Sequence, residues 1–288
     1  MSTKRRRPKL LDESNEQQKI SELYVLGKPL DTSNKIRIDI KDVINFGFCP
    51  KYYKLKKEDN NPNMRDLYDE SIHRVFYNYL NALQNGTLNR VNTYLKTLWG
   101  KEWIKTNKYS DIMITSSSLQ RDAYLQRLRD GNDSIFKFDE VISQGRQVPL
   151  MVNYRYEIEI IPNVILTGIF EYAREFLIND NFRTIQLIKF VPNYNKYMLQ
   201  VAMKYNLELI AMSYAFETLF NIKSPLQVLS FDVSHKRILT NIYNHKHYEI
   251  LKESIKNIII CIQNDIIVQC PDRKCFNCDY RKICLKTY

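Results

Sequence analysis

Residues 148–191 read VPLMVNYRYEIEIIPNVILTGIFEYAREFLINDNFRTIQLIKFV, and this stretch decides the fold. Apolar and polar side chains alternate with period two over Val148–Ile161, which is the pattern of a strand with one buried face. A Pro-Asn turn leads into a second strand over Val164–Tyr172. The turn Asn179-Asp180-Asn181 then separates it from a third strand over Thr184–Val191. Three strands joined by short turns predict an antiparallel meander.

Helices are predicted on both sides of this meander, together with two further strands. The ranges, in chain order, are 36–40 (strand), 42–57 (helix, with Cys49 on it), 65–83 (helix), a helix continuing through Trp103, a helix around 119–128, 198–221 (helix), 227–234 (strand) and 248–268 (helix). This order predicts an α/β or α+β fold with a mixed central sheet. We expect one domain over residues 36–284, with a helical part (about 65–130), a core (about 148–235) and a C-terminal cysteine segment (270–284).

The chain is strongly basic. Its 288 residues include 43 Lys and Arg against 32 Asp and Glu, a net charge of +11 with a pI near 9.2. This excess favours an anionic partner, and nucleic acid is the usual one. Residues 1–20 have the composition of a disordered tail, in which Lys4–Lys9 is a basic run typical of a nuclear address or a nucleic-acid-binding arm. No apolar stretch is long enough to span a bilayer, so we expect no membrane partner.

Four cysteines indicate a metal or cluster site. Cys275, Cys278 and Cys284 lie in the segment CFNCDYRKIC, and Cys49 lies far upstream. Thiolates are ligands for zinc and for iron–sulfur clusters. Four thiolates from these positions would join the two ends of the domain, so we expect a structural site.

The other two cysteines have different interpretations. Cys261 lies in an apolar run and is predicted to be a core residue, whereas Cys270 could replace Cys49 if the site is entirely local. Six cysteines in a chain of this length are too sparse for a disulfide framework, and no signal peptide opens the chain. We therefore expect an intracellular protein of a reducing compartment, the cytoplasm or the nucleus, rather than a secreted one.

The element order and the cysteines together resemble the iron–sulfur branch of the PD-(D/E)XK nucleases, which includes exonuclease V, the RecB-like nucleases and the CRISPR spacer-acquisition nucleases. The resemblance covers roughly residues 36–284. It implies a restriction-endonuclease-like core and a [4Fe–4S] cluster, with zinc as the alternative. Cys49, Cys275, Cys278 and Cys284 would hold the cluster.

The resemblance also implies catalytic residues that work with Mg²⁺ or Mn²⁺. His73 matches the family's helical histidine, a metal ligand. Glu171, in Gly168-Ile169-Phe170-Glu171, stands where the family has a metal-binding Asp. Lys189 matches the lysine of the acid-x-Lys motif, and Tyr214 matches the tyrosine that follows a helical Gln by four residues.

Two of these motifs are incomplete. Leu187 occupies the acid position of acid-x-Lys, and Ile210 occupies the Gln position. Magnesium needs hard oxygen ligands to fix it against a phosphodiester and activate water. Leu187 shares a strand face with Lys189 but supplies no oxygen, and Gln186 points to the opposite face of a regular strand.

Other acids could replace the missing one. Glu208 and Glu217, on the predicted helix 198–221, are available for an acid that has migrated to the neighbouring element, and the more common explanation of such residues is an ordinary charged helix face. Glu157 and Glu159 are expected on the solvent face of their strand.

Three functions follow from these residues. The first is a nucleic-acid-binding protein with a degraded nuclease site, acting as a DNA-binding or structural subunit, alone or in a protein complex. The second is an active Mg²⁺- or Mn²⁺-dependent exonuclease on single-stranded DNA. The third is a zinc-stapled interaction protein. In either nucleic-acid-binding case, we expect Tyr194, Lys196 and Tyr197, in a loop after Lys189, to contact the strand.

Overall fold

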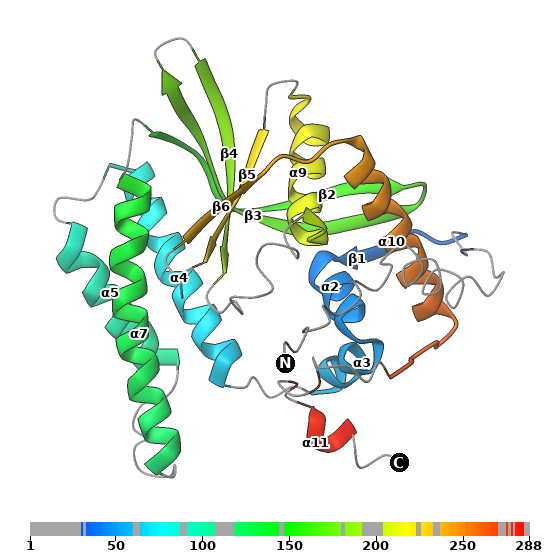
Figure 1. The fold of residues 1–288 in the computed structure, drawn as a ribbon, viewed down its shortest axis with the longest axis horizontal. Helices are drawn as coiled ribbons and strands as arrows, with labels where there is room; N and C mark the ends of the chain where they lie inside the picture. Colours follow the sequence, from blue (N-terminus) through cyan, green and yellow to red (C-terminus); the bar gives the residue numbers. More distant parts are fainter. Residues whose placement is uncertain are drawn as a thin grey trace, which may run out of the picture.

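In the computed structural model, the described residues form a six-stranded mixed sheet with helices on both faces (Figure 1). The structure describes residues 30, 33–59, 64–86, 91–106, 118–143, 147–179, 182–191, 204–222, 226–232, 237–269, 275, 278 and 280–284. The predicted fold class is therefore confirmed. The predicted basic tail over residues 1–20 lies outside the described residues.

The meander forms the centre of the sheet. Strands β2 (Gln147–Ile161), β3 (Val164–Asn179) and β4 (Phe182–Val191) pair antiparallel in succession. The three strands predicted from the alternation are confirmed, and β3 runs seven residues further than the predicted end at Tyr172. Its extension pairs with β2 on one side and with β4 on the other.

Three shorter strands complete the sheet. β1 (Ile36–Asp39) pairs parallel with the start of β3, and β5 (Leu226–Asp232) pairs parallel with β4. β6 (Arg237–Asn241) pairs antiparallel with β5 at the sheet edge. β6 was not predicted, because its five mostly exposed residues carry no clear alternation of apolar and polar side chains.

One edge of β3 is shared by two strands that leave a gap between them. β2 pairs with residues 164–176 of β3 on the other edge, so β1 and β4 both lie on the remaining edge. β1 ends with Asp39 opposite Thr167, and the ladder with β4 ends with Ile188 opposite Tyr172. Residues 168–171 of β3 therefore pair with no strand that the structure describes on that edge. The β1–β3 and β3–β4 ladders approach this gap from opposite directions, and β4 continues to Val191 paired with β5 alone.

Two helical layers cover the sheet (Figure 1). Helices α4 (Met64–Gln84), α5 (Val91–Thr106) and α7 (Ser118–Ser143) pack on one face. On the other face lie α2 (Ile40–Phe48), α3 (Pro50–Glu58), α9 (Leu207–Phe220) and α10 (His245–Gln263), and the short α11 (Arg281–Cys284) lies beside α3. Each layer forms its own apolar core against the sheet.

Two helix predictions need correction. The single helix expected over 42–57 is broken at Cys49, whose backbone is extended (φ −168°, ψ 123°) because Pro50 follows and disfavours helical geometry in the residue before it. In place of one helix over 198–221, α9 begins at Leu207, where Asn206 caps it by accepting hydrogen bonds from two backbone N–H groups, and residues 198–203 lie outside the described residues. Cys261 is buried on α10, as predicted.

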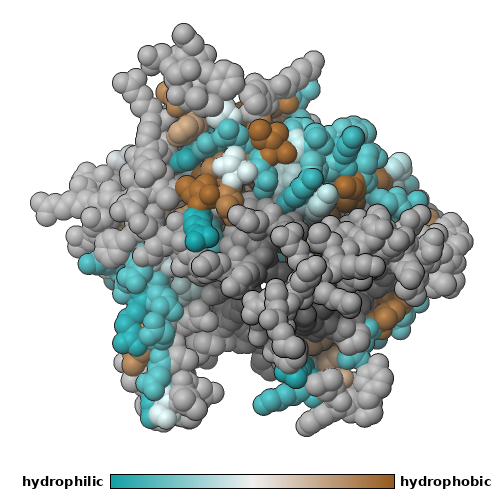
Figure 2. Space-filling model, viewed as in Figure 1, coloured by the Kyte–Doolittle hydropathy of each residue, from teal (hydrophilic) through white to brown (hydrophobic). Residues whose placement is uncertain are grey.

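The described surface shows no sign of a membrane span. Of the helices that the structure describes, none combines the length and the apolar character needed to cross a bilayer. The face shown in Figure 2 is mainly hydrophilic where residues are described, and its apolar side chains form small separate groups.

Two helical glycines test the packing of the α5–α7 layer. A Cβ added to Gly131 of α7 would overlap the Trp99 ring, whereas at Gly100 of α5 nothing lies within 4 Å. We expect Gly131→Ala to lower the free energy of unfolding by about 1–3 kcal/mol through overpacking. Gly100→Ala should instead raise it by about 0.5–1 kcal/mol, because alanine favours the helix. Urea denaturation measures both, and equal effects of the two variants would contradict the packing described.

Candidate functional site

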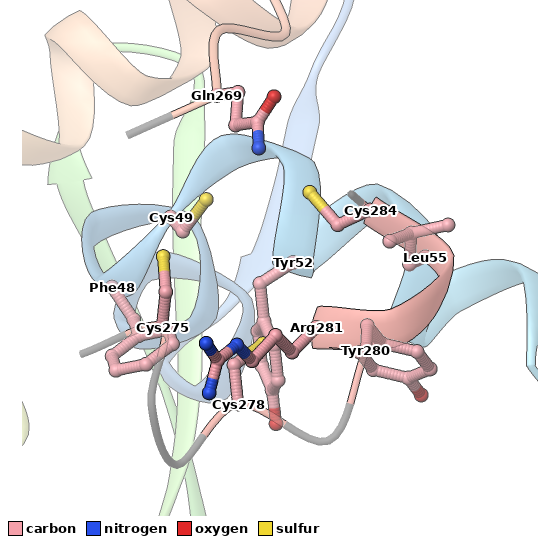
Figure 3. A pocket seen from close by; sticks show the side chains of 10 residues that line it. All are labelled: Phe48, Cys49, Tyr52, Leu55, Gln269, Cys275, Cys278, Tyr280, Arg281 and Cys284. Atoms are coloured by element: carbon pink, nitrogen blue, oxygen red, sulfur yellow. The ribbon is translucent and has the colours of Figure 1, made fainter. Parts of the chain in front are cut away.

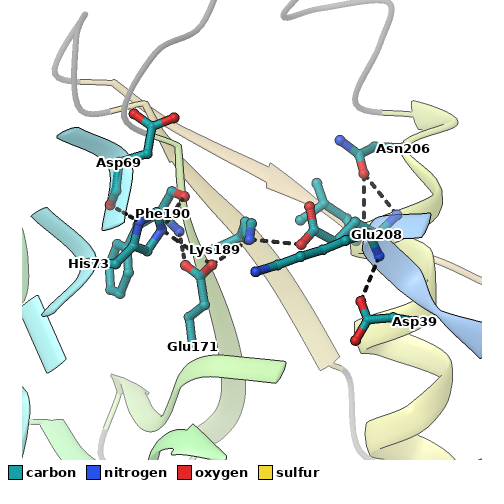
Figure 4. Close-up of polar contacts among 10 residues, drawn as sticks. Asp39, Asp69, His73, Glu171, Lys189, Phe190, Asn206 and Glu208 are labelled. Carbon is teal, nitrogen blue, oxygen red and sulfur yellow. Dashed lines mark hydrogen bonds and ion pairs between the residues drawn. The ribbon is translucent and has the colours of Figure 1, made fainter. Parts of the chain in front are cut away.

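Four charged or ionisable side chains from four different elements meet at the gap in the β3 ladder (Figure 4). Glu171 comes from β3, Lys189 from β4, His73 from α4 and Glu208 from α9. The two helices lie on opposite faces of the sheet, so both helical layers contribute to one cluster. Three of these residues, His73, Glu171 and Lys189, are those that the family resemblance selects.

Glu171 is the centre of the cluster. It is 3% exposed and forms an ion pair with Lys189 through Oε1. Its other oxygen, Oε2, accepts a hydrogen bond of 2.6 Å from the backbone N–H of Phe190. Because the β3–β4 ladder has already ended at Ile188, this N–H has a side-chain acceptor in place of a strand partner. The Glu171 carboxylate thus satisfies a backbone N–H of β4 that the ladder with β3 leaves unpaired.

His73 approaches Glu171 from the other helical layer. Its Nε2 lies 3.4 Å from Glu171 Oε1 and 3.2 Å from the carbonyl oxygen of Phe190. Its Nδ1 lies 2.6 Å from the carbonyl oxygen of Asp69, one turn earlier on α4. A hydrogen bond donated by Nδ1 to a carbonyl fixes the ring and leaves Nε2 as the atom able to bind a metal.

The cluster holds its charges in spite of burial. Burial favours neutral Glu171, but the charges of Lys189 and His73 outweigh this and lower the pKa of Glu171 to about 2. Burial likewise opposes the charged forms of Lys189 and His73, yet the nearby carboxylates raise the pKa of both above the ordinary values. A proton on His73 competes with a metal ion for the ring, and the raised pKa strengthens this competition, so metal affinity should fall as the pH falls.

Glu208 supplies the second carboxylate. Its Oε1 lies 2.8 Å from Lys189 Nζ, so the ammonium lies between Glu171 and Glu208. The Asn206 cap accepts from the N–H of Glu208 (3.0 Å) and of Leu209 (3.2 Å), which fixes the first turn of α9 beside Lys189. A carboxylate in the first turn is also favoured by the helix dipole.

The other acids raised by the sequence lie elsewhere. Glu217 accepts a 2.6 Å hydrogen bond from the Tyr248 hydroxyl, between α9 and α10. Glu157 is exposed and pairs with Arg37, and the exposed Glu159 accepts from the N–H of Asn163. Of the two helical candidates for a migrated acid, Glu208 alone reaches the cluster.

The positions of the incomplete motifs have structural roles. Leu187 is fully buried in the core beneath α9. Gln186 lies away from the cluster, where it accepts a hydrogen bond from Arg174 and donates one to Gln227. Tyr214 packs against Tyr248, with its ring centroid 5.1 Å away, and is not among the residues that line the cleft around the cluster. The structure therefore does not bring Tyr214 to His73, Glu171 and Lys189.

A cleft of about 600 Å³ opens over the cluster. Several of its lining residues were not predicted from the sequence: Asp39, Lys41, Asn45, Lys56, Asp69, Glu70, Arg74 and Tyr77. Most come from α2, α3 and α4, and no local motif marks them because the fold alone brings these elements to the gap. The predicted nucleic-acid contacts Tyr194, Lys196 and Tyr197 lie outside the described residues.

The side chains at the cleft include ligands for a hard divalent cation, but they already form ion pairs with one another or with Lys189. Two carboxylates and an imidazole are suitable ligands for Mg²⁺ or Mn²⁺. Within the part of the chain that the structure describes, no three His, Cys, Asp or Glu side chains are arranged to hold a metal ion. The Lys189 ammonium explains this at the cluster, because it already lies between the two carboxylates that a cation would need.

The four predicted cysteine ligands also come together (Figure 3). Cys49, Cys275, Cys278 and Cys284 line one small pocket of about 30 Å³ beside Phe48, Tyr52 and Leu55. Pro50 sets the extended backbone of Cys49, and the turn of α11 carries Cys284 toward it. Thiolates are ligands for zinc and for iron–sulfur clusters, but as the described residues stand no three of these cysteines are arranged to hold a metal ion. Cys270 lies outside the described residues.

Comparisons with known proteins add little to this geometry. The chain matches no protein-family model and no curated protein. One solved structure that it resembles is a candidate exonuclease from Eubacterium rectale, at 11% identity and a TM-score of 0.42, covering 95% of this chain and 92% of that chain. A similarity this distant carries no information about chemistry, so the functional argument depends on the residues of the site.

Proposed function

We propose that this protein is a divalent-cation-dependent nuclease that acts on single-stranded nucleic acid. The observation that carries the proposal is Glu208, which places a second carboxylate beside Lys189 where Leu187 leaves the expected acid position empty. With Glu171 and His73, it supplies the oxygen and nitrogen donors that phosphodiester hydrolysis requires.

Each residue has a role that its position supports. Glu171, Glu208 and the Nε2 atom of His73 would hold the cation, which supplies Lewis-acid stabilisation of the phosphoryl group and a more acidic water. Lys189 would turn from the carboxylates to the substrate, where its charge stabilises the phosphoryl oxygens and orients the attacking water. The hydrogen bond from His73 Nδ1 to Asp69 would keep the ring fixed during this change.

The cleft is consistent with one strand of nucleic acid. Its volume of about 600 Å³ suits a few nucleotide units. Lys41, Lys56 and Arg74 line it and can contact phosphates, while Tyr77 offers a ring for a base. The overall charge of +11 favours the same polyanionic partner.

A second candidate is a non-catalytic nucleic-acid-binding subunit. Leu187, 0% exposed within the core, favours it, because the acid position of the resembled family cannot bind a metal here. Lys189 would then serve as a permanent structural partner for the buried Glu171 and the partly buried Glu208 rather than as a catalytic group.

For the cysteine pocket, we propose a structural [4Fe–4S] cluster, with a single zinc ion as the alternative. Convergence of thiols from residue 49 and from residues 275–284 supports either one. The bound group would hold α3 against α11 and thereby close the domain.

The role of Glu208 can be tested by comparing two glutamates of α9. Purified protein would be incubated with end-labelled single-stranded DNA and Mg²⁺ or Mn²⁺. We expect cleavage by the wild-type protein and a loss of at least about 100-fold in Glu208→Gln, because a neutral amide is a poor cation ligand. Glu217→Gln should cleave normally, since its amide oxygen can still accept from Tyr248. Tight DNA binding without cleavage would select the non-catalytic candidate.

Lys189→Met tests whether the ammonium competes with the cation. Loss of one partner from a buried ion pair should destabilise the metal-free protein by about 3 kcal/mol, because two carboxylates lose their counter-charge. Mn²⁺ should then stabilise the variant more than the wild-type protein, while cleavage is lost. Thermal unfolding with and without Mn²⁺ measures this. An equal or smaller Mn²⁺ effect in the variant would refute the competition.

Metal analysis tests the cysteine pocket. Protein purified without oxygen should be brown and carry about four iron and four sulfide per chain. Cys278→Ser should lose the metal, whereas Cys261→Ser, a change in the core of α10, should retain it. Colourless protein with one zinc per chain would show that the pocket binds zinc and not an iron–sulfur cluster. Protein that contains neither iron nor zinc would refute the metal site.

A further inference from the structure

The hydroxyl of Tyr156 is a buried donor without an acceptor. The side chain extends from β2 toward the core under α9, is 1% exposed, and its oxygen makes no hydrogen bond to any described residue. Buried hydroxyls nearly always find a partner, because the lost bond to water is otherwise not replaced. An orphan of this kind at a functional site therefore needs an explanation.

The orphan lies directly behind the wall of the cleft. Tyr156 is the cross-strand neighbour of Gly168, and a Cβ added to Gly168 would overlap the hydroxyl oxygen. Gly168 is the first residue of the gap in the β3 ladder and lines the cleft beside Glu171. The absence of a side chain at residue 168 thus makes the space that the Tyr156 hydroxyl occupies.

Glu208 and Asp39 line the same cleft as Gly168, against which the Tyr156 hydroxyl lies. Burial, together with the negative charges of Glu208 and Asp39, raises the pKa of Tyr156 above its ordinary value. The hydroxyl consequently stays protonated and available as a donor. Figure 4 shows Glu208 in contact with Lys189, whereas Asp39 makes a separate contact.

Of these two acceptors, Glu208 is the one whose bonding must change during the reaction. Asp39 already accepts from the N–H of Lys41 (2.8 Å) and from the hydroxyl of Thr167 (3.2 Å). Glu208 has the Lys189 ammonium at 2.8 Å. If Lys189 turns to the substrate, as the proposed function requires, Glu208 loses this donor.

We propose that Tyr156 is a positioning residue whose hydroxyl donates a hydrogen bond to Glu208 once Lys189 has left that carboxylate. The bond fixes one oxygen of Glu208 and directs the other to the cation. The inference rests on the proposed function, because it assigns the donor that takes the place of Lys189. While Lys189 contacts Glu208, the hydroxyl has no acceptor among the residues that the structure describes.

Tyr156→Phe separates this role from a structural one. It removes one oxygen that makes no hydrogen bond in the metal-free protein, so the melting temperature should stay the same or rise. The kcat for single-stranded DNA with Mn²⁺ should fall on the order of 10- to 100-fold, the value of a hydrogen bond to a charged acceptor, with little change in KM. Tyr124→Phe, a buried ring stacked on Trp103 in the other helical layer, is the control and should keep kcat unchanged.

A double-mutant cycle identifies the acceptor without relying on cleavage. Mn²⁺ affinity, measured by electron paramagnetic resonance without DNA, should fall about 10-fold in Tyr156→Phe. In a Glu208→Gln background the same change should have little further effect, whereas in Asp39→Asn it should keep its full effect.

Several outcomes would overturn the inference. These are an additive effect with Glu208→Gln, a coupling with Asp39→Asn instead, unchanged Mn²⁺ affinity, or a clear loss of stability in Tyr156→Phe. Wild-type protein that binds Mn²⁺ but cleaves no nucleic acid would refute the proposed nuclease activity alone, since the cycle still reports on Tyr156. Wild-type protein that binds no Mn²⁺ would refute both.

Discussion

The buried ion pair between Lys189 and Glu171 is the interaction on which the rest of the site depends. Glu171, at 3% exposure, has lost most of its hydration, and the partly buried Lys189 supplies the charge that replaces it. The pair also joins β3 to β4 just where their backbone ladder stops. His73 reaches it from one helical layer and Glu208 from the other, so both layers and the sheet are held to one point.

The sheet topology creates the place for this pair. β1 runs parallel to β3 and β4 runs antiparallel to it, so the ladders that they form with β3 end at the same gap on one edge. A single continuous neighbour would have covered residues 168–171 and closed the cleft. Instead, the carboxylate of Glu171 accepts the Phe190 N–H that a regular ladder would have paired. Glu171 thus accepts the hydrogen bond of the unpaired backbone N–H and also supplies the counter-charge of Lys189.

Local sequence patterns predicted the parts of the fold that depend on near neighbours. The alternation over 148–191 predicted the meander, and the motif positions selected Glu171, Lys189 and His73, which the structure brings together. Asp39 could not be selected, because the pairing of β1 with β3, set by distant residues, brings it to the gap. Glu208 was one of two acids that α9 offered, and its choice over Glu217 depends on the Asn206 cap, which turns the first turn of the helix toward Lys189.

The cysteine pocket and the cleft are mechanically connected through one short helix. α2 begins after Asp39, at the edge of the cleft, and ends before Cys49, in the thiol pocket. Lys41 and Asn45 project from this helix into the cleft, and Lys56 does so from α3, which begins just after Cys49. Because Pro50 breaks the backbone between the two helices, their relative orientation is not fixed by a continuous helix and depends on side-chain contacts. A group bound by the four thiols would add a constraint at this break, and it would therefore position the wall of the cleft as well as join the chain ends.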